Sequence, residues 1–173
     1  MKTFIILLRG INVSGKNKIP MATLRDLLND LQFKNVQTYI QSGNIILESD
    51  KKKEVISKEI TTSIKTKFGF EIPVFVKTIP EWEKALNNYP FSIENEKIVA
   101  FCFLDKSAKE TRIDIKNIGE DQYKIENDVV YLNCISGFGK TKLTNNVIEK
   151  KLNVIATTRN FKTTKKLLEL AKK

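Results

Sequence analysis

Histidine is absent from this sequence of 173 residues. Its absence excludes Ser-His-Asp and Cys-His catalysis, histidine acid–base chemistry and the usual zinc sites. Only two cysteines are present, Cys102 and Cys134, and each lies within an apolar, strand-like run. Because they do not form a CxxC pair, we expect two buried structural thiols rather than a disulfide or a redox pair. We accordingly predict no metal site and no cofactor.

Long apolar runs are also missing, since none approaches the ~18 residues that a membrane span needs. The N-terminal stretch MKTFIILLRG has a basic residue and then five apolar ones, which is too short for a secretory signal, and no small-residue cleavage site follows. With 41% hydrophobic residues the chain can bury a real core. We therefore expect a cytoplasmic protein with no membrane partner, in which this stretch is a buried first strand.

Acidic residues are scarce at the two ends of the chain, which carries a net charge of +10. Residues 1–18 hold four basic and no acidic side chains, and residues 139–173 hold ten basic and two acidic ones. If the fold brings the ends together, they form one strongly positive surface. The alternative is that a lysine-rich composition alone produces the same count.

The first part of the chain predicts the order β-α-β-β-α-β. The expected elements are a strand at 2–8, a helix at 21–31, strands at 36–40 and 45–48, a helix at 50–68 and a strand at 71–77. Pro20 suits the start of the first helix, Asp50 can cap the second, and Gly69 can end it. The turn Gln41-Ser42-Gly43-Asn44 joins the middle strands as a hairpin. This order is the split βαβ pattern of a ferredoxin-like fold.

The same order begins again after residue 97. The expected elements are a strand at 98–104, a helix at 107–117, strands at 122–125 and 129–134, a helix at 142–152, a strand at 154–158 and a last helix at 161–172. The predicted class is therefore α+β, with two ferredoxin-like halves plus a C-terminal helix. We divide the chain into an N-terminal half at 1–78, a helical connector at 79–96, and a C-terminal half with its terminal helix at 97–173.

Two polar loops should meet at one end of the first half. In a split βαβ unit, the loop after the first strand and the turn between the next two strands lie at the same end of the sheet. The residues that we expect to bind a ligand there are Arg9, Gly10, Asn12, Gly15, Lys16, Asn17, Gln41, Ser42, Gly43 and Asn44. The glycines would allow a ligand to approach the backbone. The alternative interpretation is that these are only good turn residues.

Three segments of the chain carry a recognisable pattern, LLRGINVSGKNKIPMATLRDLL at 7–28, NVQTYIQSGNIILES at 35–49, and GKTKLTNNVIEKKLNVIATTRNFKT at 139–163. In the order and spacing of these segments the chain resembles a bacterial family known as domain of unknown function 1697 (DUF1697). The resemblance implies a small soluble bacterial protein with a two-part α+β fold. It implies no established activity, because the family is named for lacking one.

Other candidate binding residues lie in the second half. Gly137 and Gly139 precede Lys140 and Lys142 between a strand and a helix, a position that can bind phosphate or form an ordinary loop. We do not expect a true P-loop, because Cys134 stands five residues before the Gly-Lys-Thr, where that motif needs a glycine. The planar fork of Arg159 suits phosphate or carboxylate, and the alternative is an ion pair within the protein.

An aromatic pair in the fifth strand is open to two interpretations. Phe101 and Phe103 alternate with Cys102, so both rings share one face of the sheet. Such rings could stack nucleic-acid bases, but we expect them to be core.

Three functions remain open from the sequence. The first is binding of a phosphate-bearing ligand, a nucleic acid or a nucleotide, on the basic glycine-rich loops. The second is an enzyme acting on a small anionic substrate, with catalytic residues that the sequence does not identify. The third is a protein-interaction domain. We predict the first, and the sequence does not determine whether the loop at 136–142 faces the loop at 9–19.

Overall fold

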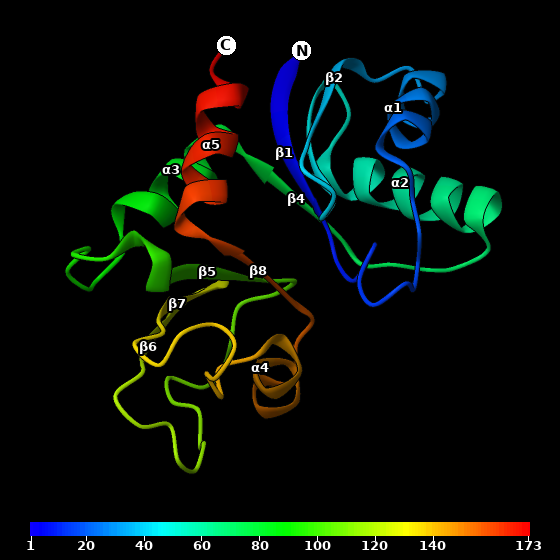
Figure 1. Ribbon diagram of the computed structural model, residues 1–173. Helices are drawn as coiled ribbons and strands as arrows, with labels where there is room; N and C mark the ends of the chain where they lie inside the picture. The colour runs from blue at the N-terminus through cyan, green and yellow to red at the C-terminus, as the bar shows by residue number, and fades with distance from the viewer. The chain divides into compact units, whose positions relative to one another are not determined.

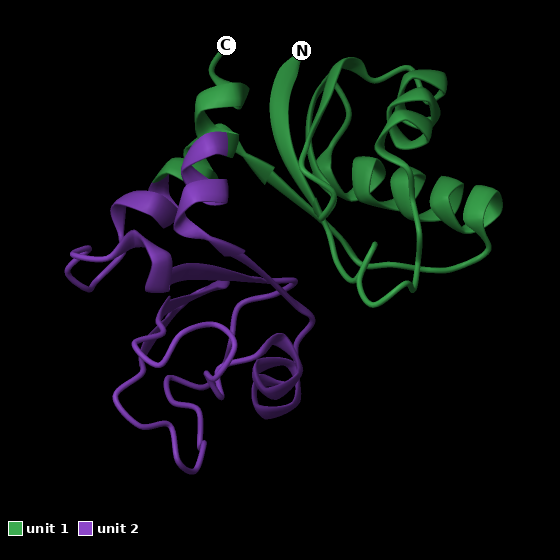
Figure 2. Ribbon diagram, viewed as in Figure 1, with its two compact units in different colours: residues 1–83, 167–173 green, residues 84–166 purple.

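The computed structural model describes residues 1–173, and Figure 1 shows them as a mixed α+β protein. The chain forms two compact units (Figure 2). Unit 1 contains Met1–Glu83 and Leu167–Lys173, and unit 2 contains Lys84–Lys166. Each unit is built on its own four-stranded antiparallel sheet, which confirms the predicted α+β class. None of the helices has both the length and the apolar character that crossing a membrane requires.

Unit 1 has the predicted ferredoxin-like order. Its elements are β1 (Lys2–Leu8), α1 (Met21–Asp30), β2 (Lys34–Tyr39), β3 (Asn44–Ser49), α2 (Lys53–Phe68), β4 (Val74–Thr78) and the start of α3 (Ile79–Asn87). The strands lie in the order β2-β3-β1-β4, and β1 pairs antiparallel with both β3 and β4. Both α1 and α2 lie on one face of this sheet (Figure 1).

The core of unit 1 is formed by apolar residues that alternate along β1 and recur at helical spacing in α1 and α2. Alternate β1 residues Phe4, Ile6 and Leu8 point to the helix face and are at most 3% exposed. Apolar residues at helical spacing in α1 and α2 cover them. Gly69 adopts the left-handed conformation and ends α2 as predicted. The predicted Asp50 cap is wrong: Lys52 stands at the cap position, and Asp50 instead pairs with the N-terminal ammonium at 2.8 Å.

Unit 2 repeats the strand order of unit 1. Its elements are the end of α3, a short 3₁₀ helix (Glu96–Ile98), β5 (Val99–Leu104), β6 (Gln122–Glu126), β7 (Val129–Asn133), α4 (Asn145–Leu152), β8 (Ala156–Asn160) and the part of α5 (Phe161–Ala171) up to Lys166. The strands lie in the order β6-β7-β5-β8. This order is that of unit 1, so the predicted duplication is confirmed at the level of topology.

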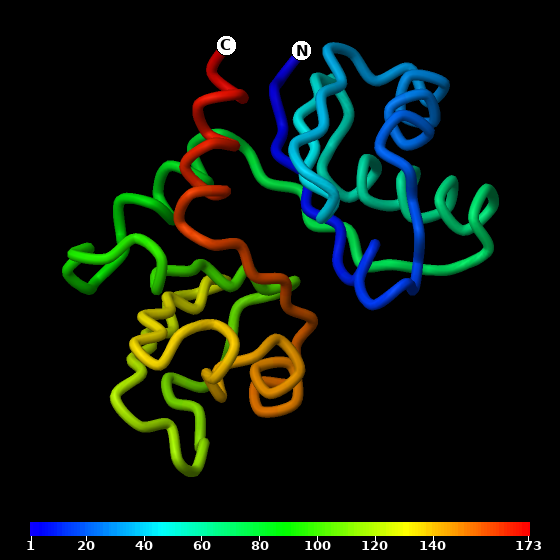
Figure 3. The backbone as a smooth tube through the Cα atoms, in the orientation of Figure 1, coloured from blue at the N-terminus to red at the C-terminus, as the bar shows by residue number.

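The helix predicted at 107–117 is wrong. Figure 3 traces this segment as an irregular loop between β5 and β6. Its β-branched residues lower helix propensity, and the Tyr123 hydroxyl holds Ile113 by accepting from its N–H (2.8 Å) and donating to its carbonyl (3.1 Å). Ile113 is buried in the core of unit 2. A tertiary contact thus stabilises an irregular segment where unit 1 has a helix.

The opposite face of the unit 2 sheet carries an aromatic cluster. Phe101 is fully buried, with ring centroids 5.4 Å from Tyr89, 5.9 Å from Tyr131 and 6.4 Å from Phe161. Phe103 is 1% exposed. The prediction that these phenylalanines are core is confirmed. Both cysteines are buried free thiols, as expected.

Candidate functional site

The basic loop, residues 9–19, does meet the turn at 41–44, as the topology predicts. Asn12 makes the connection, because its Nδ2 donates to the Gln41 carbonyl at 2.8 Å and to the Ile19 carbonyl at 3.0 Å. Its Oδ1 accepts from the Ile19 N–H at 2.8 Å. The Leu8 N–H also donates to the Gly43 carbonyl at 2.8 Å. These bonds give the two segments a fixed arrangement at one end of unit 1.

Several of the predicted site residues serve the loop itself. Asn17 Nδ2 donates to the Gly10 carbonyl at 3.0 Å. Asn44 is fully buried, and its Nδ2 donates to the Tyr39 carbonyl and to Ser42 Oγ. A Cβ on Gly43 would lie 2.6 Å from Leu8 Cβ, so this glycine is required by packing. The turn-residue interpretation therefore accounts for these contacts without a ligand.

The cations of the basic loop remain at the surface. Lys16 and Lys18 are exposed, and Arg9 is partly exposed. Lys16 closes a tight turn by donating its N–H to the Val13 carbonyl at 2.9 Å. The two central residues of this turn have positive φ, 50° at Ser14 and 72° at Gly15, as a type I′ turn requires. The turn thus presents Lys16 on a short, well-defined backbone.

Two exposed apolar side chains accompany these cations. Val13 is 59% exposed and Ile40 is 50% exposed. They neighbour Asn12 and Gln41, which the hydrogen bond described above joins. Ile40 has φ of 51°, a left-handed conformation that a β-branched residue rarely adopts. The end of unit 1 therefore combines positive charge, exposed apolar surface and a strained backbone position.

The second predicted loop, residues 136–142, belongs to unit 2. Lys140 and Lys142 are exposed on it. The loop is closed by its own backbone, since the Lys140 and Thr141 N–H groups donate to the Gly137 carbonyl at 3.1 and 2.9 Å. These donors are therefore already bonded, unlike the phosphate-binding amides of a P-loop.

A buried carboxylate fastens the same loop. Asp121 is 6% exposed and accepts from the Ser136 N–H at 2.8 Å and the Ser136 hydroxyl at 2.7 Å. Burial acts to raise the pKa of Asp121, but hydrogen bonds from Ser136 and Thr141 outweigh it and lower this pKa. Burial raises the pKa of the neighbouring Cys134 thiol, which keeps it protonated and unreactive.

Arg159 lies in β8 and is 8% exposed. Its Nη1 donates to Thr157 Oγ1 at 2.7 Å and to the Thr158 carbonyl at 3.0 Å. The guanidinium group is thus held within unit 2, where it supports its own strand. Its planar fork is largely withdrawn from solvent.

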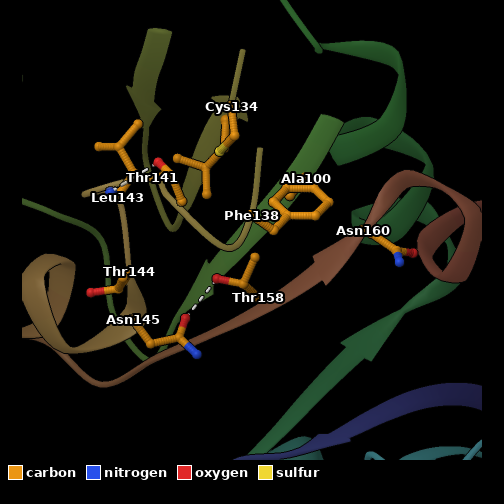
Figure 4. A pocket seen from close by; sticks show the side chains of 10 residues that line it. Ala100, Cys134, Phe138, Thr141, Leu143, Thr144, Asn145, Thr158 and Asn160 are labelled. Carbon is orange, nitrogen blue, oxygen red and sulfur yellow. Dashed lines mark hydrogen bonds between the residues drawn. The ribbon is translucent and has the colours of Figure 1, made fainter. Parts of the chain in front are cut away.

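A cavity of about 260 Å³ lies beside the 136–142 loop, within unit 2 (Figure 4). We call it the α4 cavity, because it adjoins the start of that helix. Its lining residues are Ala100, Leu132, Cys134, Phe138, Thr141, Leu143, Thr144, Asn145, Thr158 and Asn160. None of them is charged. Sequence patterns did not indicate this cavity, because its residues come from three strands, a loop and a helix.

Taken together, these features define a protein of two ferredoxin-like α+β units with a basic loop in the first and an uncharged cavity in the second. The chain belongs to the family described as protein of unknown function (DUF1697), whose sequence model matches residues 1–131. This membership confirms the resemblance seen in the sequence.

A solved structure supports the same fold. The conserved bacterial protein SP0830 from Streptococcus pneumoniae is 24% identical, and the match covers 98% of each chain with a TM-score of 0.76. The similarity therefore includes both units. No curated protein matches the chain.

Proposed function

We propose that this chain binds a phosphate-bearing ligand, a nucleic acid or a nucleotide, through the basic loop of unit 1. The observation that carries the proposal is the charge of the loop, in which Arg9, Lys16 and Lys18 occur without any carboxylate. Lysine and arginine side chains neutralise phosphates, and such contacts supply most of the affinity of non-specific nucleic-acid binding.

The rigidity of the loop supports this proposal. Asn12 and Asn17 bond the loop to itself and to the neighbouring turn. A ligand therefore meets a preorganised backbone, and binding orders little besides the lysine side chains. The asparagines thus act as positioning residues for the cations rather than as contacts to the ligand.

The apolar surface beside the cations also supports it. Val13 and Ile40 are half or more exposed, and single-stranded nucleic acid offers flat base faces next to its phosphates. The left-handed conformation of Ile40 adds to this argument, since strained backbone positions cluster at ligand-binding sites. Lys140 and Lys142, which are exposed on unit 2, are separate candidate contacts for phosphate.

The test is fluorescence anisotropy with labelled single-stranded and duplex oligonucleotides and a labelled nucleoside triphosphate, over a series of salt concentrations. The variant Lys16→Glu/Lys18→Glu should bind all of them more weakly. For a single strand, the slope of log affinity against log salt should fall by about 1.4, from about 0.7 for each lost phosphate contact.

The matched control is Lys58→Glu/Lys116→Glu, which changes the net charge equally at exposed positions that are not part of the loop. The control should keep the wild-type slope. Equal weakening in both variants would reduce the effect to net charge and refute the loop as a site. Arg159 is left out of the test, because its burial makes a loss of stability inseparable from a loss of binding.

A further inference from the structure

Ala100 lines the α4 cavity at a position where unit 1 has a phenylalanine. In unit 1, Phe4 pairs with Thr78, the last residue of the edge strand β4. In unit 2, Ala100 pairs with Asn160, the last residue of the edge strand β8. The two units share one strand order, so Phe4 and Ala100 are equivalent positions. Both positions line a cavity beside the start of a helix, but the cavity at Phe4 includes charged lining residues and the cavity at Ala100 has none.

The polar groups of the cavity present hydrogen-bond donors. Asn145 Oδ1 accepts from the Thr158 hydroxyl at 2.6 Å (Figure 4) and from the Cys102 thiol. Asn160 Oδ1 accepts from the Thr163 N–H at 2.9 Å. A backbone N–H can only donate, so the orientation of the Asn160 amide is determined by this bond. Both oxygens are thus occupied, and both amide nitrogens are left as donors.

An aromatic side chain covers the opening. Phe138 lines the cavity while 44% of it remains exposed. It stands between Gly137 and Gly139, and Gly137 has φ of 87°. A ring on such a backbone can stack on a flat ligand that enters beside it. The rest of the lining is apolar or a threonine.

We propose that the α4 cavity binds an uncharged, flat ring that carries carbonyl acceptors, the chemistry of a pyrimidine base. The apolar lining and Phe138 contact the ring, and the amide nitrogens of Asn145 and Asn160 donate to its carbonyl oxygens. The absence of charged lining residues excludes a free anion, which would lose its hydration without compensation. The volume is below the range of roughly 300–1,000 Å³ for drug-sized ligands, so the ring must be small.

The base could come from a nucleoside or from a nucleotide. Lys140 and Lys142 flank the lining residue Thr141. A phosphate attached to a bound base would therefore find two exposed cations beside the cavity. This inference stands on unit 2 alone and does not depend on the basic loop of unit 1.

The experiment is ligand-observed NMR on the full chain with uridine, uridine monophosphate and benzene, a ring without acceptors. Uridine should bind and benzene should not compete with it. If a nucleotide is the source, the monophosphate binds more tightly, and Lys140→Ala/Lys142→Ala removes only that advantage. If a nucleoside is the source, the two bind equally.

Two variants test the location. Ala100→Phe should abolish uridine binding by placing a ring inside the cavity. Phe138→Ala, at an exposed position that should leave folding unchanged, should weaken binding about tenfold through the loss of stacking. Ile155→Ala is the matched control, since Ile155 is 39% exposed in the same unit and does not line the cavity.

Three results would overturn the inference. These are no uridine binding at millimolar concentration, binding that Phe138→Ala leaves unchanged, and binding that Ile155→Ala weakens as much as Phe138→Ala does. Because Phe138→Ala and Ile155→Ala replace exposed side chains, the test holds even where Ala100→Phe fails to fold.

Discussion

Gly43 offers a direct test of whether the glycines at the end of unit 1 serve packing or ligand approach. Its φ is +80°, and a Cβ placed there would lie 2.6 Å from Leu8 Cβ and 2.9 Å from Ile11 Cδ1. The Ile11 methyl group can rotate away, but Leu8 Cβ is fixed to the backbone of β1. Gly43→Ala must therefore displace the central strand of unit 1.

The magnitude follows from two contributions. A left-handed conformation costs an L-residue roughly 1–2 kcal/mol, and overpacking a rigid core costs typically 1–3 kcal/mol. Alanine recovers about 0.4–1 kcal/mol by restricting the unfolded chain. We expect Gly43→Ala to lower the free energy of unfolding of unit 1 by about 3 kcal/mol.

Gly15→Ala and Gly10→Ala are the matched controls. Both positions have positive φ, 72° and 75°, but nothing lies within 4 Å of a Cβ placed at either. Only the conformational cost applies, so each variant should lose about 1 kcal/mol. The difference between Gly43→Ala and these controls isolates the packing contribution.

Urea denaturation followed by tryptophan fluorescence is the assay. Trp82 is the sole tryptophan, it is fully buried, and it belongs to unit 1, so its emission reports the unfolding of that unit. A loss at Gly43 no greater than that at Gly15 would refute the packing role, and Gly43 would again be a candidate for close approach of a ligand.

Two further predictions concern pH. Folding lowers the pKa of Asp121, so the stability that Asp121 contributes is complete above its unfolded pKa and is lost as the pH falls through the folded value. Because Asp121 belongs to unit 2, which has no tryptophan, urea unfolding is followed here by circular dichroism. Asp121→Asn should lower the urea midpoint of unit 2 at pH 7 and reduce the further loss of stability below about pH 4. If Asp121→Asn lost as much stability at low pH as the wild-type protein does, the role of Asp121 would be contradicted. Burial, with a smaller effect of Glu126 and Asp128, raises the pKa of Tyr131 from 10.0 to about 12, so stability should fall as the pH rises between these values. Tyr131→Phe should reduce that fall in stability. The phenolate absorbance of native Tyr131→Phe should show one group fewer titrating near pH 12 than the wild-type protein does. Titration of Tyr131 at the ordinary tyrosine pKa would contradict its burial.

Much of the architecture could be predicted from the sequence, because it depends on local patterns. The apolar run of β1, the helical stripes of α1 and α2, and the turn at 41–44 each specify their element from neighbouring residues. Gly69 ended α2 as expected, since a helix end needs a left-handed residue that glycine adopts easily. The order of these elements was sufficient to predict the ferredoxin-like topology of each unit.

The segment at 107–117 shows where local patterns were insufficient. Its apolar residues were compatible with a weak helix. The two hydrogen bonds between the Tyr123 hydroxyl and the Ile113 backbone, together with the burial of Ile113, stabilise an irregular loop instead. Partners distant in the sequence decided the outcome, and propensity is too weak to oppose them.

The features of the candidate sites likewise include some that the sequence determined and others that only the fold decided. The sequence by itself determined the charge of the basic loop, the absence of histidine chemistry and the meeting of the loop with the turn at 41–44. Only the tertiary structure decided what Asn12, Gly43 and Arg159 do, because hydrogen-bond partners and close contacts depend on the folded backbone. The α4 cavity likewise depends on the fold, because its lining residues come from three strands, a loop and a helix that only the folded backbone brings together.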